Sequence, residues 1–321
     1  MRVNLFYLSP NPYGGWVTFT AHLMRALRAA GADPRLFKVG NKTENKERPY
    51  GYGETYRNLS AEDAKLKSGP NIVVAAAKNF APVTEALLAR GAYLVLHDPT
   101  ELKNLPADLP QRRVVVIRRA GLEIAPSANF IRHPYQRAKP SRPVTRERMV
   151  SVSRIDFDKR THILLDANRL LAPQRITIRG FENRIYTRFK VVPHYPEWVQ
   201  SVAQYPRDAT AAVELLAGAA LMADMSQIKG DGGGTQYTFL EAWDAGCVPV
   251  LHEDWTAGRP QDDMQPGLNC MTVSSAEELA QLYRHADPTL EEAMVQRGYE
   301  QLEQHDPKLI GDQYLSLLNP V

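Results

Sequence analysis

A run of glycines stands directly in front of an apolar helix that carries one carboxylate. Residues 230–251 read GDGGGTQYTFLEAWDAGCVPVL, and the pattern predicts a turn, a helix and then a buried strand. Gly233 and Gly234 would let backbone N–H groups approach an anion at the positive end of the helix dipole. Glu241 needs a partner among its apolar neighbours, and the two hydroxyl groups of a ribose would suit it. Two alternatives stay open: the glycines could form a plain flexible loop, and Glu241 could pair with a backbone group or an arginine.

Two cations follow the end of another expected strand. Residues 151–165 read SVSRIDFDKRTHILL, which puts Arg154 at the strand end and Lys159 just before a helix. A guanidinium fork and an ammonium point charge at this place would neutralise a diphosphate. The alternative is a surface ion pair of Arg154 with Asp156 or Asp158.

Two further pairs of candidates follow expected strands in the first half of the chain. Gly14 and Gly15 open a helix after the first strand, where backbone N–H groups could approach a ligand, although a tight turn needs the same residues. His97 and Asp98 follow the apolar strand in YLVLHDPTEL. A histidine beside a carboxylate could position a sugar and take part in proton transfer. Open parallel sheets bind ligands beyond the carboxyl ends of their strands, so both pairs lie where a site is expected.

These candidates require parallel sheets to position them. Apolar strand-like runs alternate with amphipathic helices, which is typical of α/β domains whose sheets are covered on both faces. The Pro-rich, basic stretch 138–149 is expected to be a linker, because the alternation starts again after it. We therefore expect two Rossmann-like domains facing a cleft. Residues 40–60 are expected to form a polar loop, and RFKVVPHY (188–195) is expected to form a strand. No GxGxxG motif of the type that binds dinucleotides follows any expected strand.

Composition narrows the classes of protein. The chain has 321 residues, 44% of them hydrophobic, and no apolar run reaches the roughly 18 residues of a membrane span. The two cysteines, Cys247 and Cys270, have apolar neighbours, which argues against a disulfide framework or a cysteine metal site and favours the cytoplasm. No cluster of histidines and acids has metal-ligand spacing, so no metal is expected.

Basic residues and tyrosines suggest a surface for a polyanion. Residues 112–148, which include Arg118 and Arg119, hold ten Arg or Lys against two Glu, although the net charge of the chain is only +3. The segment ERPYGYGETYR interleaves tyrosines with arginines, which suits contact with a nucleic-acid backbone and stacking on a displaced base. Its DNA-binding candidates are Arg48, Tyr50, Tyr52 and Arg57. A solvated basic face and an ordered surface loop are the alternatives.

The Arg154-x4-Lys159 spacing, the glycine-rich turn and YTFLEAWDAGCVPVL together resemble the nucleotide-sugar half of retaining glycosyltransferases with the GT-B fold. The segments MRVNLFYLSPNPYGGWVTF and LVLHDPTEL extend the resemblance to the DNA α-glucosyltransferases of T-even bacteriophages. The resemblance implies an N-terminal acceptor-binding domain over residues 1–142 and a nucleotide-sugar domain over 143–300. It also implies that a C-terminal helix, within 301–321, crosses back to the first domain.

The resemblance also implies roles for the candidates. Arg154 and Lys159 would hold the donor's diphosphate, and Glu241 would hold the ribose hydroxyls. His97 and Asp98 would be catalytic, lying at the reacting sugar and the acceptor hydroxyl. The other implied donor-binding residues are Gly14, Gly15, Gly233, Gly234, Gln236, Tyr237 and Thr238. This chain departs from the pattern at the first of two glutamates usual before the last strand, because Gly233 or Gln236 stands there. The departure leaves the sugar open.

The implied activity is transfer of a sugar, with retention, from a UDP-sugar to the hydroxyl of a 5-hydroxymethylpyrimidine in double-stranded DNA. UDP-glucose is the expected donor, no prosthetic group or membrane partner is expected, and the protein would be a monomer, in the host cytoplasm if a phage encodes it. One alternative keeps the fold but uses a cell-surface glycan or a lipid-linked acceptor. Another is a nucleotide-sugar epimerase or a catalytically silent DNA-binding relative.

Overall fold

The computed structural model divides the chain into two compact units. The first contains Met1–Gln136, Gly230–Gly233 and Gln304–Val321, and the second contains Arg137–Lys229 and Gly234–Glu303. The expected domain boundaries lay at 142/143 and 300/301. The structure describes residues 1–10, 14–40, 44–104, 109–143, 145–197, 211–228, 233–258, 263–285 and 287–319.

The first unit is built on a sheet that is parallel except for one edge strand. Its order over the described residues is β3-β4-β2-β1-β5-β6-β7-β8, and only β3 runs antiparallel to its neighbour. The strands are β1 (Arg2–Leu8), β2 (Asp33–Val39), β3 (Glu44–Gly51), β4 (Glu54–Leu59), β5 (Asn71–Ala76), β6 (Tyr93–Leu96), β7 (Val114–Val116) and β8 (Asn129–Phe130). The central strands β1, β5 and β6 are almost wholly buried, as their continuous apolar sequences predict.

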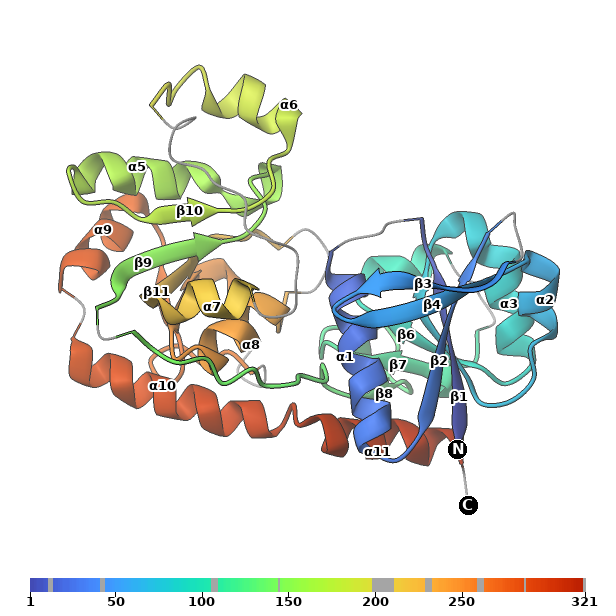
Figure 1. Cartoon of the computed structure of the whole chain (residues 1–321). Helices are drawn as coiled ribbons and strands as arrows, with labels where there is room; N and C mark the ends of the chain where they lie inside the picture. The colour runs from blue at the N-terminus through green and yellow to red at the C-terminus, as the bar shows by residue number, and fades with distance from the viewer. Residues whose placement is uncertain are drawn as a thin grey trace. The chain divides into compact units, whose positions relative to one another are not determined.

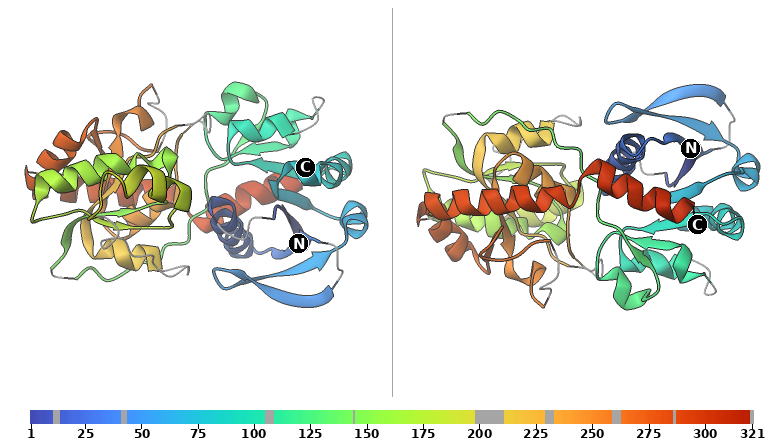
Figure 2. Two further views of the ribbon diagram at one scale, coloured as in Figure 1. Left: turned by 90° about the horizontal axis from the view of Figure 1, so that it is seen from above. Right: turned by 90° about the horizontal axis from the view of Figure 1, so that it is seen from below.

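Helices cover both faces of this sheet, and one of them comes from the far end of the chain. They are α1 (Gly15–Ala29), α2 (Ala61–Leu66), α3 (Ala81–Ala89), α4 (Gly121–Ile124) and α11 (Pro307–Leu318). α11 lies against α1 (Figure 2), and a Cβ at Gly311 would overlap the carbonyl oxygen of Ala26. Glycine therefore permits the close approach of the two helices. The expected return of a C-terminal helix to the first domain is confirmed.

The expected polar loop at 40–60 is wrong for most of its length, because β3 and β4 form a hairpin there. Its tip needs left-handed backbone: Gly51, Tyr52 and Gly53 have φ of 120°, 57° and 79°. The hairpin is also fixed to α1. Buried Glu54 accepts two hydrogen bonds of 2.7 Å from the Arg28 guanidinium. A bidentate ion pair of this kind explains why polar sequence forms a strand here.

The second unit has a wholly parallel sheet in the order β10-β9-β11-β12-β13 over the described residues (Figure 1). The strands are β9 (Glu147–Val152), β10 (Thr177–Arg179), β11 (Ala219–Asp224), β12 (Val248–His252) and β13 (Met271–Val273). The helices are α5 (Thr161–Leu171), α6 (Arg184–Tyr186) with a π-helical turn over Thr187–Val191, α7 (Ala211–Ala217), α8 (Tyr237–Asp244), α9 (Ala276–His285) and α10 (Pro288–Glu303). The α/β prediction with two parallel-sheet domains is confirmed.

The strand expected at 188–195 is wrong, because this segment is helical up to Val191. Asn183 starts the helix: its side-chain oxygen accepts hydrogen bonds from the N–H groups of Ile185 and Tyr186 at 3.0 and 3.3 Å. Capping by asparagine outweighs the β preference of the valines that follow. No helix in the described part of the chain is long and apolar enough to cross a bilayer.

Candidate donor site and acceptor-side residues

The strand order of the second sheet reverses between β9 and β11, and candidate donor residues gather at the carboxyl ends of these strands. β10 lies on one side of β9 and β11 on the other. Such a switch point is where open α/β sheets bind ligands. Lys159 comes from the segment after β9, and its Nζ donates a 2.5 Å hydrogen bond to Ser226 Oγ, which follows β11. The predicted lysine is therefore held across the switch point.

Arg154 is exposed at the same strand end and is paired with two carboxylates. Its Nη1 lies 2.7 Å from Asp156 Oδ2 and its Nη2 lies 2.9 Å from Asp158 Oδ2. The guanidinium is therefore held by the acids that the sequence named as alternative partners. Exposed pairs of this kind contribute little to stability, so a phosphate could displace them at small cost.

The glycine-rich turn has a backbone that only glycine adopts easily. Gly233 and Gly234 have φ of 63° and 85°, in the left-handed region. The turn leads into α8, whose N-cap Gln236 makes no side-chain capping bond and whose first turn holds no acid. The buried hydroxyl of Thr238 has no partner among the described residues. The helix thus begins with polar groups and a positive dipole end suited to an anion; glycines 230 and 232 lie outside the described residues.

Glu241 lies in α8 and is 8% exposed. Burial, and after it the charge of Asp244 on the same helix, raise the pKa of its carboxyl to about 7. No described residue donates a hydrogen bond to this carboxylate, so the partner that the sequence required is not supplied by the described part of the chain. A buried carboxyl left in this state gains from a ligand that brings hydroxyl donors.

The sequence interpretation missed the buried acid that organises the lysine. Asp224, 2% exposed at the end of β11, accepts hydrogen bonds through Oδ1 from the backbone N–H of Ser226, at 2.8 Å, and from its hydroxyl. Lys159, Ser226 and Asp224 thus form one chain of hydrogen bonds. The other carboxylate oxygen of Asp224 is buried without a partner among the described residues. An acid at the end of an apolar strand was the available signal.

A second missed acid fixes the linker. Asp244 is buried and accepts hydrogen bonds from Arg137 Nε at 3.0 Å and from the backbone N–H groups of Ala138 and Lys139 at 2.5 and 3.2 Å. One carboxylate therefore ties the start of the second unit to α8, the helix that carries Glu241.

In the first unit, His97 and Asp98 follow β6 as predicted. His97 is buried, and its Nε2 lies 2.7 Å from the carbonyl oxygen of Val74. A carbonyl only accepts, so Nε2 carries the proton. Burial, above all, lowers the pKa of His97 to about 4, and the ring is neutral at pH 7. Asp98 is less buried, and its Oδ1 accepts a 2.7 Å hydrogen bond from the Thr100 N–H.

Glu101 is a further acid beside this pair that the sequence interpretation missed. It is 9% exposed, and its Oε2 accepts a 2.9 Å hydrogen bond from the His97 backbone N–H. Burial raises the pKa of Glu101 to about 8. A small pocket lies over this turn; it is lined by Leu96, His97, Asp98, Pro99, Val116, Arg118 and Gly121.

Gly14 and Gly15 form the start of α1, as predicted. Gly14 is the N-cap with φ of 97°, and the first turn of α1 holds no acid. Apart from the chain neighbours and the backbone of α1 itself, no atom of the described residues lies within 4 Å of a Cβ built on either glycine. The backbone is therefore open to a ligand at the carboxyl edge of β1.

The predicted DNA-binding tyrosines pack on their own unit. The Tyr50 ring meets Tyr7 edge-on at 5.5 Å, and burial raises the pKa of its hydroxyl. The Tyr52 hydroxyl lies 2.8 Å from Thr18 Oγ1. Stacking of these two rings on a base would need the hairpin to rearrange.

The predicted DNA-binding arginines all belong to the first unit. Arg57 pairs with Glu47 at 2.9 Å and Arg48 is half-buried on the same hairpin. Arg118 lines the pocket beside Asp98, and Arg119 lies over the Phe130 ring at 4.7 Å.

Part of the basic run 112–148 is used inside the second unit. Arg142 Nη2 donates a 2.5 Å hydrogen bond to the Tyr299 hydroxyl, Arg146 donates to the carbonyl oxygens of Ala217 and Gly246, and Arg148 pairs with Glu291 at 2.9 Å. With Arg137, these residues hold the linker and β9 in place. The basic residues that remain for a polyanion are concentrated before residue 133.

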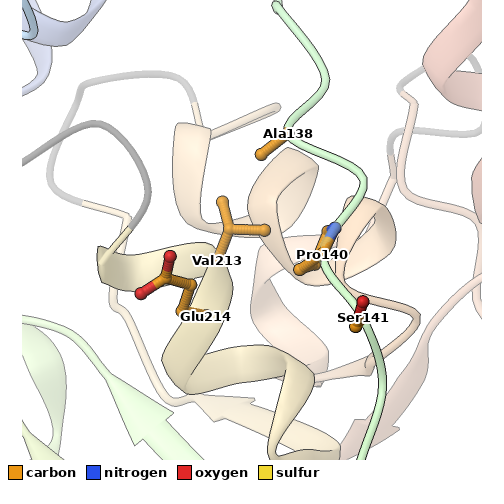
Figure 3. Close-up of a pocket in the computed structure, with 5 residues that line it drawn as sticks. All are labelled: Ala138, Pro140, Ser141, Val213 and Glu214. Carbon is orange, nitrogen blue, oxygen red and sulfur yellow. The ribbon is translucent and has the colours of Figure 1, made fainter.

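A pocket of about 310 Å³ lies elsewhere in the second unit, between the linker and α7 (Figure 3). Ala138, Pro140 and Ser141 line one side and Val213 and Glu214 the other. None of the predicted site residues lines it. Among the residues that the structure describes, no three histidine, cysteine or acidic side chains come together as a metal site.

Solved structures resemble the chain over its whole length, whereas sequence comparison finds no relative. No family model matches the chain, and no curated protein matches its sequence. Anabaena HepE in complex with UDP superimposes with a TM-score of 0.74 at 14% identity, covering 100% of both chains. An α-glucosyltransferase in complex with UDP gives a TM-score of 0.71 at 14% identity, covering 99% of both chains. The same enzyme with UDP and DNA containing a hydroxymethyluracil base gives 0.69 at 14%.

Likeness at this level of identity establishes architecture. Two parallel-sheet domains and a C-terminal helix that rejoins the first domain are shared along the full length of these structures. The chain therefore has the GT-B fold of the nucleotide-sugar glycosyltransferases.

Proposed function

We propose that the protein is a retaining glycosyltransferase whose UDP-sugar binds the second unit. The observation that carries this proposal is a combination of three features in that unit: Lys159 is held by Ser226, the N-cap Gln236 of α8 makes no side-chain capping bond, and no described residue donates a hydrogen bond to the buried carboxyl of Glu241. Lys159 and the start of α8 would bind the diphosphate, and Arg154 would exchange its surface acids for it. Glu241 would accept hydrogen bonds from the ribose hydroxyls. The structural likeness to enzymes bound to UDP and UDP-glucose supports the donor class.

The proposed acceptor is the hydroxyl of a 5-hydroxymethylpyrimidine in double-stranded DNA. Support comes from the likeness to an α-glucosyltransferase bound to DNA with a hydroxymethyluracil base. Basic residues of the first unit, among them Arg118 beside the His97–Asp98 turn, suit a DNA backbone. Asp98 would orient the acceptor hydroxyl, and neutral His97 would contact the sugar without adding charge.

The chemistry asks the protein mainly to stabilise charge on the leaving group. The bond between the anomeric carbon and the diphosphate oxygen breaks, and the acceptor oxygen bonds to the same carbon from the same face. The acceptor proton passes to an oxygen of the departing UDP. Negative charge then grows on the diphosphate, where Lys159, Arg154 and the helix dipole would act. UDP-glucose is the expected sugar donor.

A transfer assay read by mass spectrometry tests the proposal. UDP-glucose and other UDP-sugars would be offered to duplexes carrying cytosine, 5-hydroxymethylcytosine or 5-hydroxymethyluracil. We expect a hexose- or pentose-sized mass gain on a hydroxymethylated base alone. Lys159→Ala should abolish most of the gain at low donor concentration, with exposed Arg297→Ala as the matched control. Transfer that is equal in both variants would contradict the donor site.

The second candidate function keeps the donor site and changes the acceptor to a glycan or a lipid-linked sugar. The likeness to Staphylococcus aureus TarM bound to UDP and α-GlcNAc-glycerol favours it, with a TM-score of 0.56 over 78% of this chain and 55% of TarM. Slow hydrolysis of UDP-glucose without a mass gain on any duplex would select this candidate over DNA.

A further inference from the structure

α6 and the π-helical turn that follows it belong to the second unit (Figure 1). They carry an exposed group of apolar side chains together with cations. Ile185, Phe189 and Val192 are 64%, 61% and 41% exposed. Their spacing of four and three residues places them along one side of a helix. Arg184, just before Ile185, and Arg188 and Lys190, on either side of Phe189, are also exposed, and residues 184–196 contain no acid. We call these six residues the 184–192 surface.

The inner side of the same segment is occupied by the unit's own core. Tyr186, Val191 and Tyr195 are buried there with residues of α5 and β10. The apolar residues of the 184–192 surface are therefore additional to those needed for folding. Large exposed apolar side chains in such a group mark an interaction site.

The 184–192 surface is attached to the proposed donor site. Asn183, which caps α6, donates a 2.8 Å hydrogen bond from Nδ2 to Asp156 Oδ1, and Asp156 pairs with Arg154. The exposed Phe157 ring meets Tyr186 edge-on at 4.9 Å. A partner bound to this surface would thus contact the segment that carries Arg154 and Lys159.

The arrangement of charged and apolar side chains in the 184–192 surface favours DNA over a bilayer as the partner. Arg188 and Lys190 flank Phe189 on both sides, and the Arg188 guanidinium lies 5.4 Å from the Phe189 ring centre. A helix that lies in a bilayer separates its apolar and charged sides. Here the cations share the outer side with the apolar residues, because the core occupies the other. A DNA groove fits this arrangement: cations contact the phosphates while an apolar side chain enters between base steps.

We propose that the 184–192 surface is a second DNA contact, with Phe189 and Ile185 as apolar wedges and Arg184, Arg188 and Lys190 on the backbone. This inference rests on the proposed DNA acceptor. It adds a DNA contact on the second unit, next to the segment that carries Arg154 and Lys159. Loss of base stacking at the wedge would favour displacement of a nearby base.

Fluorescence anisotropy with a labelled duplex tests the cations. Neutralising two phosphate contacts in Arg188→Ala/Lys190→Ala should lower the slope of log K against log salt by about 1.8. Arg297→Ala, an exposed arginine on α10 with a 2.8 Å ion pair to Glu300, is the matched control. A slope equal to that of the control variant would overturn the proposal.

A 2-aminopurine reporter in the duplex tests the wedge. Binding of the full-length protein should raise its fluorescence, and Ile185→Ala/Phe189→Ala should remove the rise while leaving the salt slope unchanged. Leu290→Ala, 46% exposed on α10, is the control. UDP-glucose affinity and thermal stability should be unchanged in every variant, since the altered side chains are exposed.

The remaining outcomes each overturn the inference. Loss of binding to phosphatidylglycerol vesicles, with DNA binding intact, would assign the surface to a bilayer. A lower sedimenting mass of the variant than of the wild type would assign the surface to a second copy of the chain.

The test is separate from the transfer assay. DNA binding that depends on the 184–192 surface supports the inference even if no sugar is transferred. Sugar transfer that is unchanged in the variants leaves the proposed function standing without this contact.

Discussion

The carboxyl of Glu241 should make donor binding depend on pH. Its pKa of about 7 in the donor-free protein comes from burial and from Asp244. Two ribose hydroxyls would donate hydrogen bonds to the ionised form, so the donor must bind the carboxylate and lower the pKa. The proton has to leave before binding, and affinity therefore rises with pH through 7. Linkage with this pKa makes UDP-glucose bind about tenfold more weakly at pH 6 than at pH 8.

Isothermal titration of UDP-glucose between pH 5.5 and 8.5 measures this dependence. UDP-glucose is the right probe because both of its phosphates are esterified, whereas the terminal phosphate of UDP titrates in the same range. Glu241→Gln keeps the size of the side chain but replaces the carboxyl with an amide that does not ionise. We expect it to flatten the pH profile and to weaken binding at pH 8 by about 10- to 100-fold, the loss of hydrogen bonds to a charged group worth about 1.5–3 kcal/mol.

Unfolding of the donor-free protein tests independently whether the pKa of Glu241 is raised. A carboxyl whose pKa is raised from 4.5 to about 7 stabilises the fold at low pH, and the free energy of unfolding falls as pH rises from about 4.5 to about 7. Glu241→Gln should remove that fall. If the wild type and the variant share one pH profile of UDP-glucose affinity, Glu241 does not hold the ribose and the reasoning is refuted.

Four other changes have defined outcomes. Lys159→Ala should weaken UDP-glucose binding by about 10- to 100-fold in the same titration, because a charged partner of the diphosphate is lost; unchanged affinity would remove the lysine from the site. Asp98→Asn should lower kcat of the transfer reaction with little change in KM for the donor, and a change in KM alone would contradict its acceptor-side role. Gly311→Ala should lower the free energy of unfolding by about 1–3 kcal/mol in urea, since its methyl group would force α11 away from α1, while exposed Gln313→Ala should not. Glu101, with a pKa raised from 4.5 to about 8, should make the free energy of unfolding fall as pH rises from about 4.5 to about 8, and Glu101→Gln should flatten that curve in thermal melts; equal curves would mean that the carboxyl is already ionised.

The features that could be predicted from the sequence depend on local rules. Gly233 and Gly234 precede a helix, and Lys159 and His97 follow apolar strands, so their places at the carboxyl edges of the sheets could be read directly. The two parallel sheets could be predicted for the same reason, since each apolar strand alternates with an amphipathic helix.

The features that were missed depend on partners far apart in the chain. The hairpin at 44–59 is fixed by Glu54 and Arg28, 26 residues apart, and polar sequence gave no sign of that pairing. Asp244 meets Ala138 and Lys139 of the linker, 106 and 105 residues before it, so nothing in the local sequence indicated that it anchors the linker. The basic run looked like a surface because the acceptors of Arg146 and Arg148 lie 71 to 143 residues later.

The first unit is completed by a segment from the far end of the chain, and this has a consequence for biosynthesis. The ribosome completes residues 137–303 before it makes α11, the helix that covers α1. The second unit can fold as soon as it emerges, since domains fold as units during synthesis. The first unit, although it is made first, must wait with the apolar side of α1 uncovered. A chaperone that binds nascent chains would therefore find its target at the N-terminus of this protein late in translation. A stop codon before residue 304 would leave the second unit attached to a first unit whose α1 stays uncovered.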